Sequence, residues 1–274
     1  MRHTDISTQV LTEKSVSISG ETIAYYDNEE GETTLLFIHG AFINKEYWDE
    51  QLAAFSFGYR VVAPDLPGHG NSSHRGNDWS FEKYGRDLNE FIIKLSLTNV
   101  IVIGHSNGAD IMLEAVTENN PCIIGIIAVD YFKNAGIPLP ENVRKQTIAD
   151  LKADFANTNS GYAKQVLLTE KTNKPIVDSV VKDFGEMDPE VGIPFNEGAF
   201  SYTNREIDLL KRLPLKLYLI NVDYSPTNQD NLKKQVGNNY ELNIIRGTCH
   251  FPMIENPEIF NKVLERVLLK IQSC

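Results

Sequence analysis

Residues 99–118 read NVIVIGHSNGADIMLEAVTE and contain the most specific structural signal in the chain. A Val/Ile-rich run ends at Gly104, and a helical pattern starts at about Ser106. Between them, residues 104–108 have the spacing Gly-x-Ser-x-Gly, which in a strand–turn–helix context is typical of a nucleophile elbow. The glycines permit a turn too sharp for side chains, and the helix N-terminus favours a developing anion. We interpret Ser106 as a nucleophile; a plain turn with a serine N-cap explains the flanking strand and helix less well.

The same alternation of short apolar runs and longer amphipathic stretches extends along the chain. Short runs apolar on both faces are typical of strands buried between two helical layers. We therefore predict an α/β fold with a mostly parallel eight-stranded sheet flanked by helices. The strands are expected at residues 14–26 (two antiparallel strands around a turn at Ser19-Gly20), 33–38, 60–63, 99–103, 122–129, 215–221 and 241–245. The helices are expected at residues 45–55, 81–95, 106–118 and, after an Asn256 cap, to about 271.

Residues 133–213 contain no convincing strand. They predict a helical cap inserted between strands 6 and 7, while residues 1–132 and 214–274 form the core. Because open α/β sheets bind ligands at the carboxyl ends of their strands, such a cap would cover the site. Breaks between its helices are expected at Pro138/Pro140, residues 157–159, Pro175, Pro189 and Pro194.

A serine hydroxyl needs a neighbouring base to become a strong nucleophile. His250 lies in the loop between the last strand and the final helix, where the base is expected in this chain order, whereas His105 is expected to pack beneath the elbow. The acid that orients the histidine should end a late strand. Asp223 follows the seventh strand and is favoured by its position; Asp130, which ends the sixth strand, is the main alternative.

An acyl-transfer site also needs donors for the oxyanion and a pocket for the substrate. The backbone N–H groups of Asn107 and Ala41 are the candidate oxyanion donors. The expected pocket residues are Phe42, Tyr131, Phe132 and Phe251, together with cap aromatics such as Phe155, Phe184 or Phe195.

Composition narrows the possible partners. A formal net charge of −11 and the lack of a Lys/Arg cluster disfavour nucleic acid and an anionic membrane surface. Three scattered cysteines suggest neither a disulfide framework nor a zinc site, and no metal or organic cofactor is expected. Residues 1–10 lack the apolar core of a signal peptide, so a cytoplasmic protein is expected, although a chain whose leader had been removed would have the same pattern. The sequence contains no pattern that indicates the oligomeric state.

These motifs together resemble the α/β-hydrolase superfamily, in particular its capped esterase and haloperoxidase-like branch. The resemblance covers nearly the whole chain and depends on residues 39–42 with Trp48, residues 61–72 (VVAPDLPGHGNS), the elbow and residues 250–257. The chain departs from the family pattern at Cys249, where glycine is usual, and at residues 109–110, where small residues are commoner. A serine at position 106 disfavours the aspartate-dependent dehalogenases and epoxide hydrolases.

The resemblance and the residues together predict hydrolysis of the ester of a small or medium-sized molecule through an acyl-enzyme. A lactonase, an amidase, a carbon–carbon bond hydrolase and a perhydrolase would use the same triad, so these alternatives stay open. From another class, a non-catalytic ligand receptor on the same fold is the competing hypothesis.

Overall fold

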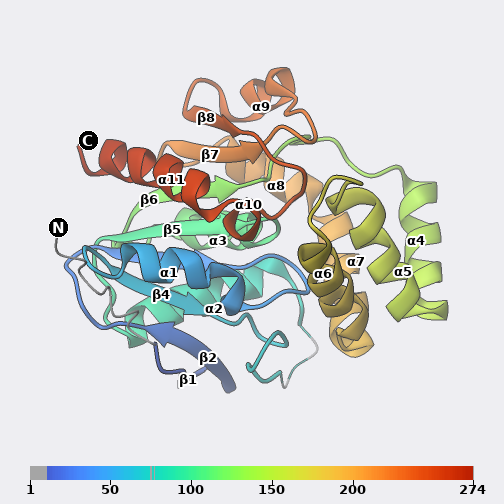
Figure 1. Cartoon of the computed structure of the whole chain (residues 1–274), viewed down its shortest axis with the longest axis horizontal. Coiled ribbons are helices and arrows are strands. Elements are labelled where there is room, and N and C mark those ends of the chain that lie inside the picture. The colour runs from blue at the N-terminus through green and yellow to red at the C-terminus, as the bar shows by residue number, and fades with distance from the viewer. Residues whose placement is uncertain (1–10, 75, 77, 274) are drawn as a thin grey trace, which may run out of the picture.

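The sheet has the predicted eight strands in one mixed layer, in the order β1-β2-β4-β3-β5-β6-β7-β8 (Figure 1). The computed structural model describes residues 11–74, 76 and 78–273, so the expectation for residues 1–10 and the terminal Cys274 lie outside it. β1 and β2 form an antiparallel hairpin, β2 pairs antiparallel with β4, and all later pairs are parallel. The strands are β1 (Lys14–Ile18), β2 (Glu21–Asp27), β3 (Thr34–Ile38), β4 (Arg60–Pro64), β5 (Val100–His105), β6 (Ile123–Val129), β7 (Leu217–Val222) and β8 (Tyr240–Ile245).

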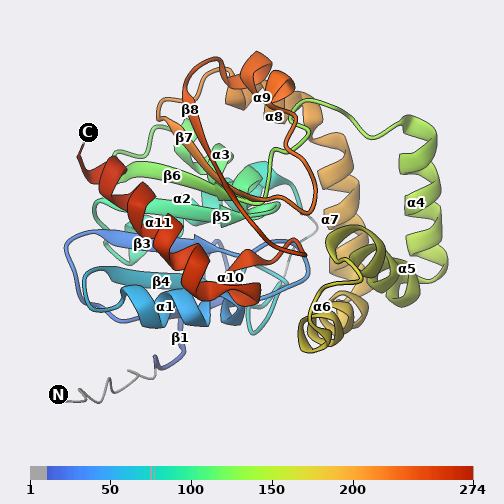
Figure 2. The ribbon, with the colours of Figure 1, turned by 45° about the horizontal axis from the view of Figure 1, so that its top comes forward.

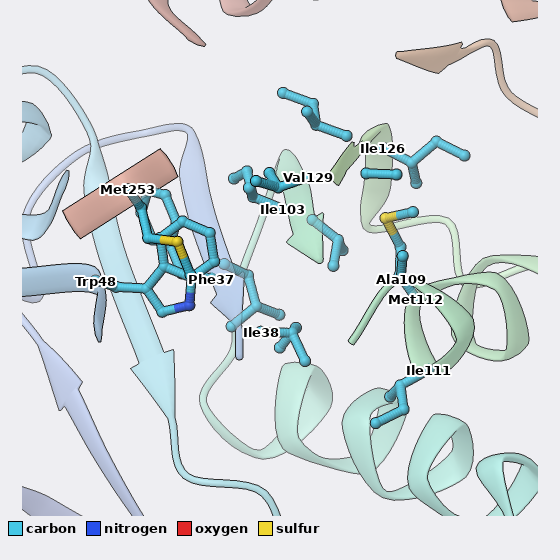
Figure 3. Packing of buried hydrophobic residues seen from close by; sticks show 14 of the residues in the cluster. Phe37, Ile38, Trp48, Ile103, Ala109, Ile111, Met112, Ile126, Val129 and Met253 are labelled. Carbon is cyan, nitrogen blue, oxygen red and sulfur yellow. The ribbon is translucent and has the colours of Figure 1, made fainter. Parts of the chain in front are cut away.

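Helices cover both faces of this sheet, as the buried strands require. Trp48 and Met253 pack with Phe37 of β3 on one side, and Ile111 and Met112 belong to the helix packed on the other side (Figure 3). The core helices are η1 (Lys45–Trp48, a 3₁₀ turn), α1 (Asp49–Phe55), α2 (Phe81–Lys94), α3 (Gly108–Thr117), α9 (Gln229–Val236), α10 (Pro252–Glu255) and α11 (Pro257–Gln272). As predicted, Asn256 caps α11 by accepting a hydrogen bond from the Ile259 N–H at 3.2 Å.

The segment between β6 and β7 is helical and lies at one end of the sheet (Figures 1 and 2). This confirms the predicted helical insert between strands 6 and 7. It contains α4 (Glu141–Ala153), α5 (Phe155–Tyr162), the π-helical turn η2 (Ala163–Leu167), α6 (Lys174–Glu186), α7 (Pro189–Ser201) and α8 (Thr203–Leu210).

Two of the predicted helix breaks are wrong. Residues 157–159 lie inside α5, where the Asp154 side chain caps the helix and the buried Asn159 donates to the Phe184 carbonyl at 2.6 Å. Pro194 lies inside α7, whose buried Phe195 ties it to the aromatic cluster around Phe42. Tertiary packing therefore overrides the local preference of these residues for turns.

None of the helices in the described part of the chain combines the length and the apolar character needed to cross a membrane.

Candidate active site

Ser106 stands at the predicted turn between β5 and α3, with a φ of 52°. This left-handed conformation is costly for a residue with a side chain, and such strain concentrates at functional sites. The two glycines of the motif are required by contact. A Cβ on Gly104 would lie 2.6 Å from the Gly108 carbonyl oxygen, and one on Gly108 would lie 2.6 Å from the His39 carbonyl oxygen. The strand, the turn and the helix can therefore approach closely enough to present the serine only with glycine at both positions.

His250 lies in the loop between β8 and α10 and lines the same cavity as Ser106. Its Nδ1 lies 2.6 Å from Asp130 Oδ2, and its Nε2 has no hydrogen-bond partner in the described residues. With Nδ1–H donating to the carboxylate, Nε2 is left unprotonated, as a general base must be. Hydrogen bonds of this kind are often long before substrate binds, so the lack of a short Ser106–His250 contact is compatible with catalysis.

The histidine backbone is also held from two directions. Its N–H donates to the Leu167 carbonyl of η2 at 2.8 Å, and its carbonyl lies 2.9 Å from Nε2 of His105. Burial lowers the pKa of His105 well below its ordinary value, so this ring is neutral and donates from Nε2. The expectation that His105 packs beneath the elbow is consistent with this position, and the structure adds that it anchors His250.

The predicted choice of acid needs correction: the residue paired with His250 is Asp130 and not Asp223. Asp223 is exposed, and its Oδ1 accepts from the Gly247 N–H at 3.1 Å. Asp130 follows β6 with a φ of 48°, and its Oδ1 accepts from the Val222 N–H at 2.8 Å. Its backbone conformation and this second hydrogen bond direct the other oxygen towards His250.

Lys133 is a partner of Asp130 that the sequence did not reveal. Its ammonium lies 2.8 Å from Asp130 Oδ1, donates to the Val222 carbonyl at 2.9 Å, and sits 4.0 Å from the centre of the Tyr224 ring. Burial alone would raise the pKa of Asp130, but the hydrogen bond and charge of His250, with Lys133, hold it below its ordinary value. In the sequence, the only indication of this ion pair is that Lys133 follows Asp130 by three residues.

The cavity beside Ser106 has a volume of about 270 Å³. The backbone amides of Ala41 and Asn107 lie in residues that line it, and neither donates a hydrogen bond within the described part of the chain. Both are therefore free to receive an oxygen atom. Phe42, Tyr131 and Phe251 line the cavity as expected, and Phe184 contributes from α6.

Three other predicted aromatics do not line this cavity. Phe155 and Phe195 pack edge-on against Phe42 behind the wall, with ring centres 6.4 and 5.6 Å away. Phe132 lies in the wall of a neighbouring cavity. Side chains of α4, α5 and α7 complete the roof over Ser106, among them Thr147, Leu151, Thr158, Asn159, Asn196 and Phe200.

Comparison with known proteins fits this architecture. The family described as "alpha/beta hydrolase fold" matches residues 33–257, so the chain belongs to that family. A thermophilic esterase from Thermogutta terrifontis has a similar structure, with a TM-score of 0.81, 18% identity, and coverage of 95% of this chain and 99% of the other. A bromoperoxidase from Bacillus anthracis gives a TM-score of 0.80 at 18% identity over 94% and 99% of the two chains.

Similarity of sequence to curated proteins is more local. The chain is 37% identical over 90 residues to a non-heme chloroperoxidase, CPO-A1, from Kitasatospora aureofaciens. This match covers 32% of each chain, so the similarity spans about a third of that relative's length. The family and the fold together define a hydrolase of the α/β class.

Proposed function

We propose that this chain is a serine hydrolase that cleaves the carboxylic ester of a small or medium-sized molecule through an acyl-enzyme. The observation that carries the proposal is the arrangement around one cavity. Ser106 lines it at a strained turn, and His250 lines it with Nδ1 held by the buried Asp130 and Nε2 free. This is the relation of nucleophile, base and orienting acid that acyl transfer requires.

The reaction follows from the positions of these groups. Ser106 Oγ attacks the ester carbonyl carbon while His250 Nε2 accepts its proton, and Asp130 stabilises the imidazolium that forms. The amides of Ala41 and Asn107 bind the oxyanion, a contribution on the order of 3 kcal/mol for each donor. The imidazolium then gives its proton to the departing alcohol oxygen. Water, deprotonated by His250, attacks the acyl-enzyme and releases the acid and Ser106.

Esterase chemistry is supported by the apolar wall of the cavity. Phe42, Leu151, Phe184 and Phe251 surround the space beside Ser106, which suits an uncharged acyl group. Lactone, amide, carbon–carbon and peroxide-dependent reactions remain alternatives, because they would use the same three side chains and differ in the pocket.

The test is initial-rate hydrolysis of p-nitrophenyl esters from acetate to decanoate, with Ser106→Ala beside the unchanged protein. We expect turnover that disappears in Ser106→Ala, with a maximum at short or medium acyl chains because the cavity is about 270 Å³. Equal rates in both proteins would refute Ser106 as the nucleophile. If neither protein turned over any ester while a small molecule raised the melting temperature, the receptor hypothesis would replace this one.

A further inference from the structure

A second cavity, of about 580 Å³, adjoins the one beside Ser106. The two share wall residues that include Tyr131, Phe200 and His250. Ser106 lines only the first cavity, whereas Asp110 and Glu206 line only the second. Its outer wall contains the exposed side chains of Ile137, Leu139, Val143, Tyr162 and Val166, so it is open to solvent.

In the proposed reaction, the two cavities would hold different parts of the substrate. The acyl group stays on Ser106 and is surrounded by the first cavity. The leaving alcohol must lie where His250 can protonate its oxygen. Because His250 lines both cavities and Ser106 lines only the first, we assign the second cavity to the leaving group of the proposed reaction.

Asp110 is an unusual residue in the wall of this second cavity. It is 1% exposed, and its Oδ2 accepts from the Tyr131 hydroxyl at 2.6 Å and from the side-chain Nδ2 of Asn107 at 3.2 Å. Its Oδ1 accepts no hydrogen bond from any donor in the described residues. A buried carboxylate oxygen without a donor is costly, which points to a donor that arrives with a ligand.

Glu206 of α8 supplies a second carboxyl group to the same wall, with Oε1 accepting from the Gly136 N–H at 3.0 Å. The other charged groups nearby are already compensated. Lys133 pairs with Asp130 at 2.8 Å, and Arg205 pairs with Glu114 at 2.7 Å. In the described part of the chain, no Lys or Arg nitrogen forms an ion pair with Asp110 or Glu206.

We infer that Asp110 and Glu206 form a subsite for an alkylammonium group carried by the alcohol portion of the substrate. The inference rests on the proposed ester hydrolysis, because it assigns the second cavity to the leaving group. An ammonium N–H supplies the donor that Asp110 Oδ1 lacks and the positive charge that the two carboxyl groups lack. The aromatic rings of Tyr131, Phe200 and Tyr202 in the same wall suit the alkyl substituents of such a cation.

Proton binding by the pair gives the subsite a pH dependence. Burial and then the charge of Glu206 raise the pKa of Asp110 well above its ordinary value, and burial raises the pKa of Glu206 to about 7. The other groups that interact with Asp110 are Tyr131, the Asn107 side chain, Tyr202 and Glu114, and Glu114 is ion-paired with Arg205 of α8. Below pH 7 the pair retains a proton that a bound cation must displace, so ammonium recognition strengthens as the pH rises.

The test compares two esters of nearly the same shape, dimethylaminoethyl butyrate and isopentyl butyrate, followed by pH-stat titration. We expect kcat/KM for the ammonium ester to exceed that of the neutral ester by about tenfold, the discrimination typical of one charge-assisted hydrogen bond. The ratio should rise as the pH passes through about 7 and fall towards one in Asp110→Asn and Glu206→Gln. Glu190→Gln, which removes an exposed carboxylate of α7 that lines neither cavity, should leave the ratio unchanged.

A second measurement separates this inference from the proposed function. Calorimetry on Ser106→Ala should show tighter binding of the ammonium ester than of the neutral one, and adding Glu206→Gln should abolish the difference. If the protein hydrolysed both esters equally and neither Asp110→Asn nor Glu206→Gln changed the ratio, the subsite would be refuted and the esterase would stand. If neither ester were hydrolysed but selective binding were observed, the subsite would stand and the esterase proposal would fall. Asparagine keeps an acceptor for Tyr131, and Glu206 is only partly buried, so at least one variant is expected to fold.

Discussion

Four residues with side chains adopt left-handed backbone conformations where β3, β5 and β6 end: Phe42, Ser106, Asp130 and Phe132, with φ between 48° and 62°. Each costs on the order of 1–3 kcal/mol and persists only where its surroundings fix it. Asp130 is fixed on one oxygen by Val222 and Lys133 and on the other by His250. These contacts hold the Asp130 carboxylate in one orientation, and the strained backbone of this residue persists because they fix it.

This geometry predicts that Asp130 and Asp223 respond differently to the same change. Asp130→Asn should lower kcat for p-nitrophenyl butyrate by about 10⁴-fold, because an amide cannot hold His250 in the required tautomer. Asp223→Asn is the matched control and should leave kcat close to that of the unchanged protein. The opposite result, with Asp223→Asn the inactive variant, would show that the histidine loop adopts another arrangement during turnover.

Lys133 gives a second prediction, because its charge lies against the same carboxylate as the histidine. Lys133→Met should lower kcat for a neutral ester by less than Asp130→Asn does, because Asp130 keeps its hydrogen bonds with the Val222 N–H and with His250. Initial rates with p-nitrophenyl butyrate measure the change. Lys145→Met, at an exposed position of α4, should leave kcat unchanged, and a loss in Lys133→Met as large as that in Asp130→Asn would refute this ranking.

Tyr202 and Arg205, at the start of α8, join the insert to α3 of the core. Glu114 of α3 is 2% exposed and accepts from the Tyr202 hydroxyl at 2.7 Å and from Arg205 at 2.9 and 2.7 Å. Two parallel hydrogen bonds from one guanidinium to one carboxylate, as between Arg205 and Glu114, are stronger than a single one. Because the Arg205 side chain is 40% exposed, solvent weakens the pair, but Glu114 would remain buried if the arginine were lost.

Arg205→Met should therefore lower the free energy of unfolding by about 1–2 kcal/mol, less than the loss expected for a fully buried pair. Urea unfolding measures the change. Arg212→Met, an exposed position just after α8, serves as the comparison and should unfold like the unchanged protein. If both variants had the same midpoint, the pair would not contribute to stability.

The sequence predicted the sheet and the helical insert well because their signals are local. Strands such as β5 are apolar on both faces, and the nucleophile turn has glycines that no other residue can replace. The choice between Asp130 and Asp223 is not local. Both follow a buried strand, and only the backbone conformation of Asp130 and the path of the His250 loop decide which carboxylate the imidazole meets.

For the same reason, the partners of Asp130 and Asp110 escaped sequence reasoning. Lys133 and Glu206 lie on segments whose position relative to β6 and α3 depends on how the insert packs. The pocket prediction failed in part at Phe155 and Phe195, because an aromatic cluster and a cavity wall have the same composition.

The stability of the folded protein should depend on pH through Glu206. Its ordinary pKa is 4.5 and its pKa in the folded protein is about 7, so the folded state binds more protons between these values. Stability from this group is present below pH 4.5 and is lost as the pH rises through about 7. Asp130 acts in the opposite sense, but below its ordinary value of 3.8 and thus outside this window.

The check is the melting temperature as a function of pH for the unchanged protein and Glu206→Gln. The difference between the two proteins should change in favour of the variant as the pH rises from 4.5 to 7. Glu190→Gln, with an exposed carboxylate, should give a curve parallel to that of the unchanged protein. Parallel curves for Glu206→Gln would mean that the folded protein does not shift this carboxyl group.

The hydrogen bond between the Leu167 carbonyl and the His250 N–H makes the insert part of the scaffold that aligns the base. A movement of η2 away from the sheet would break this hydrogen bond and release the loop that contains His250. We therefore expect substrate to enter and product to leave through the solvent-exposed side of the 580 Å³ cavity while the hydrogen bond between Leu167 and His250 stays formed. Grafting a foreign insert onto this core would succeed only if the transplanted backbone supplied a carbonyl oxygen at the same point.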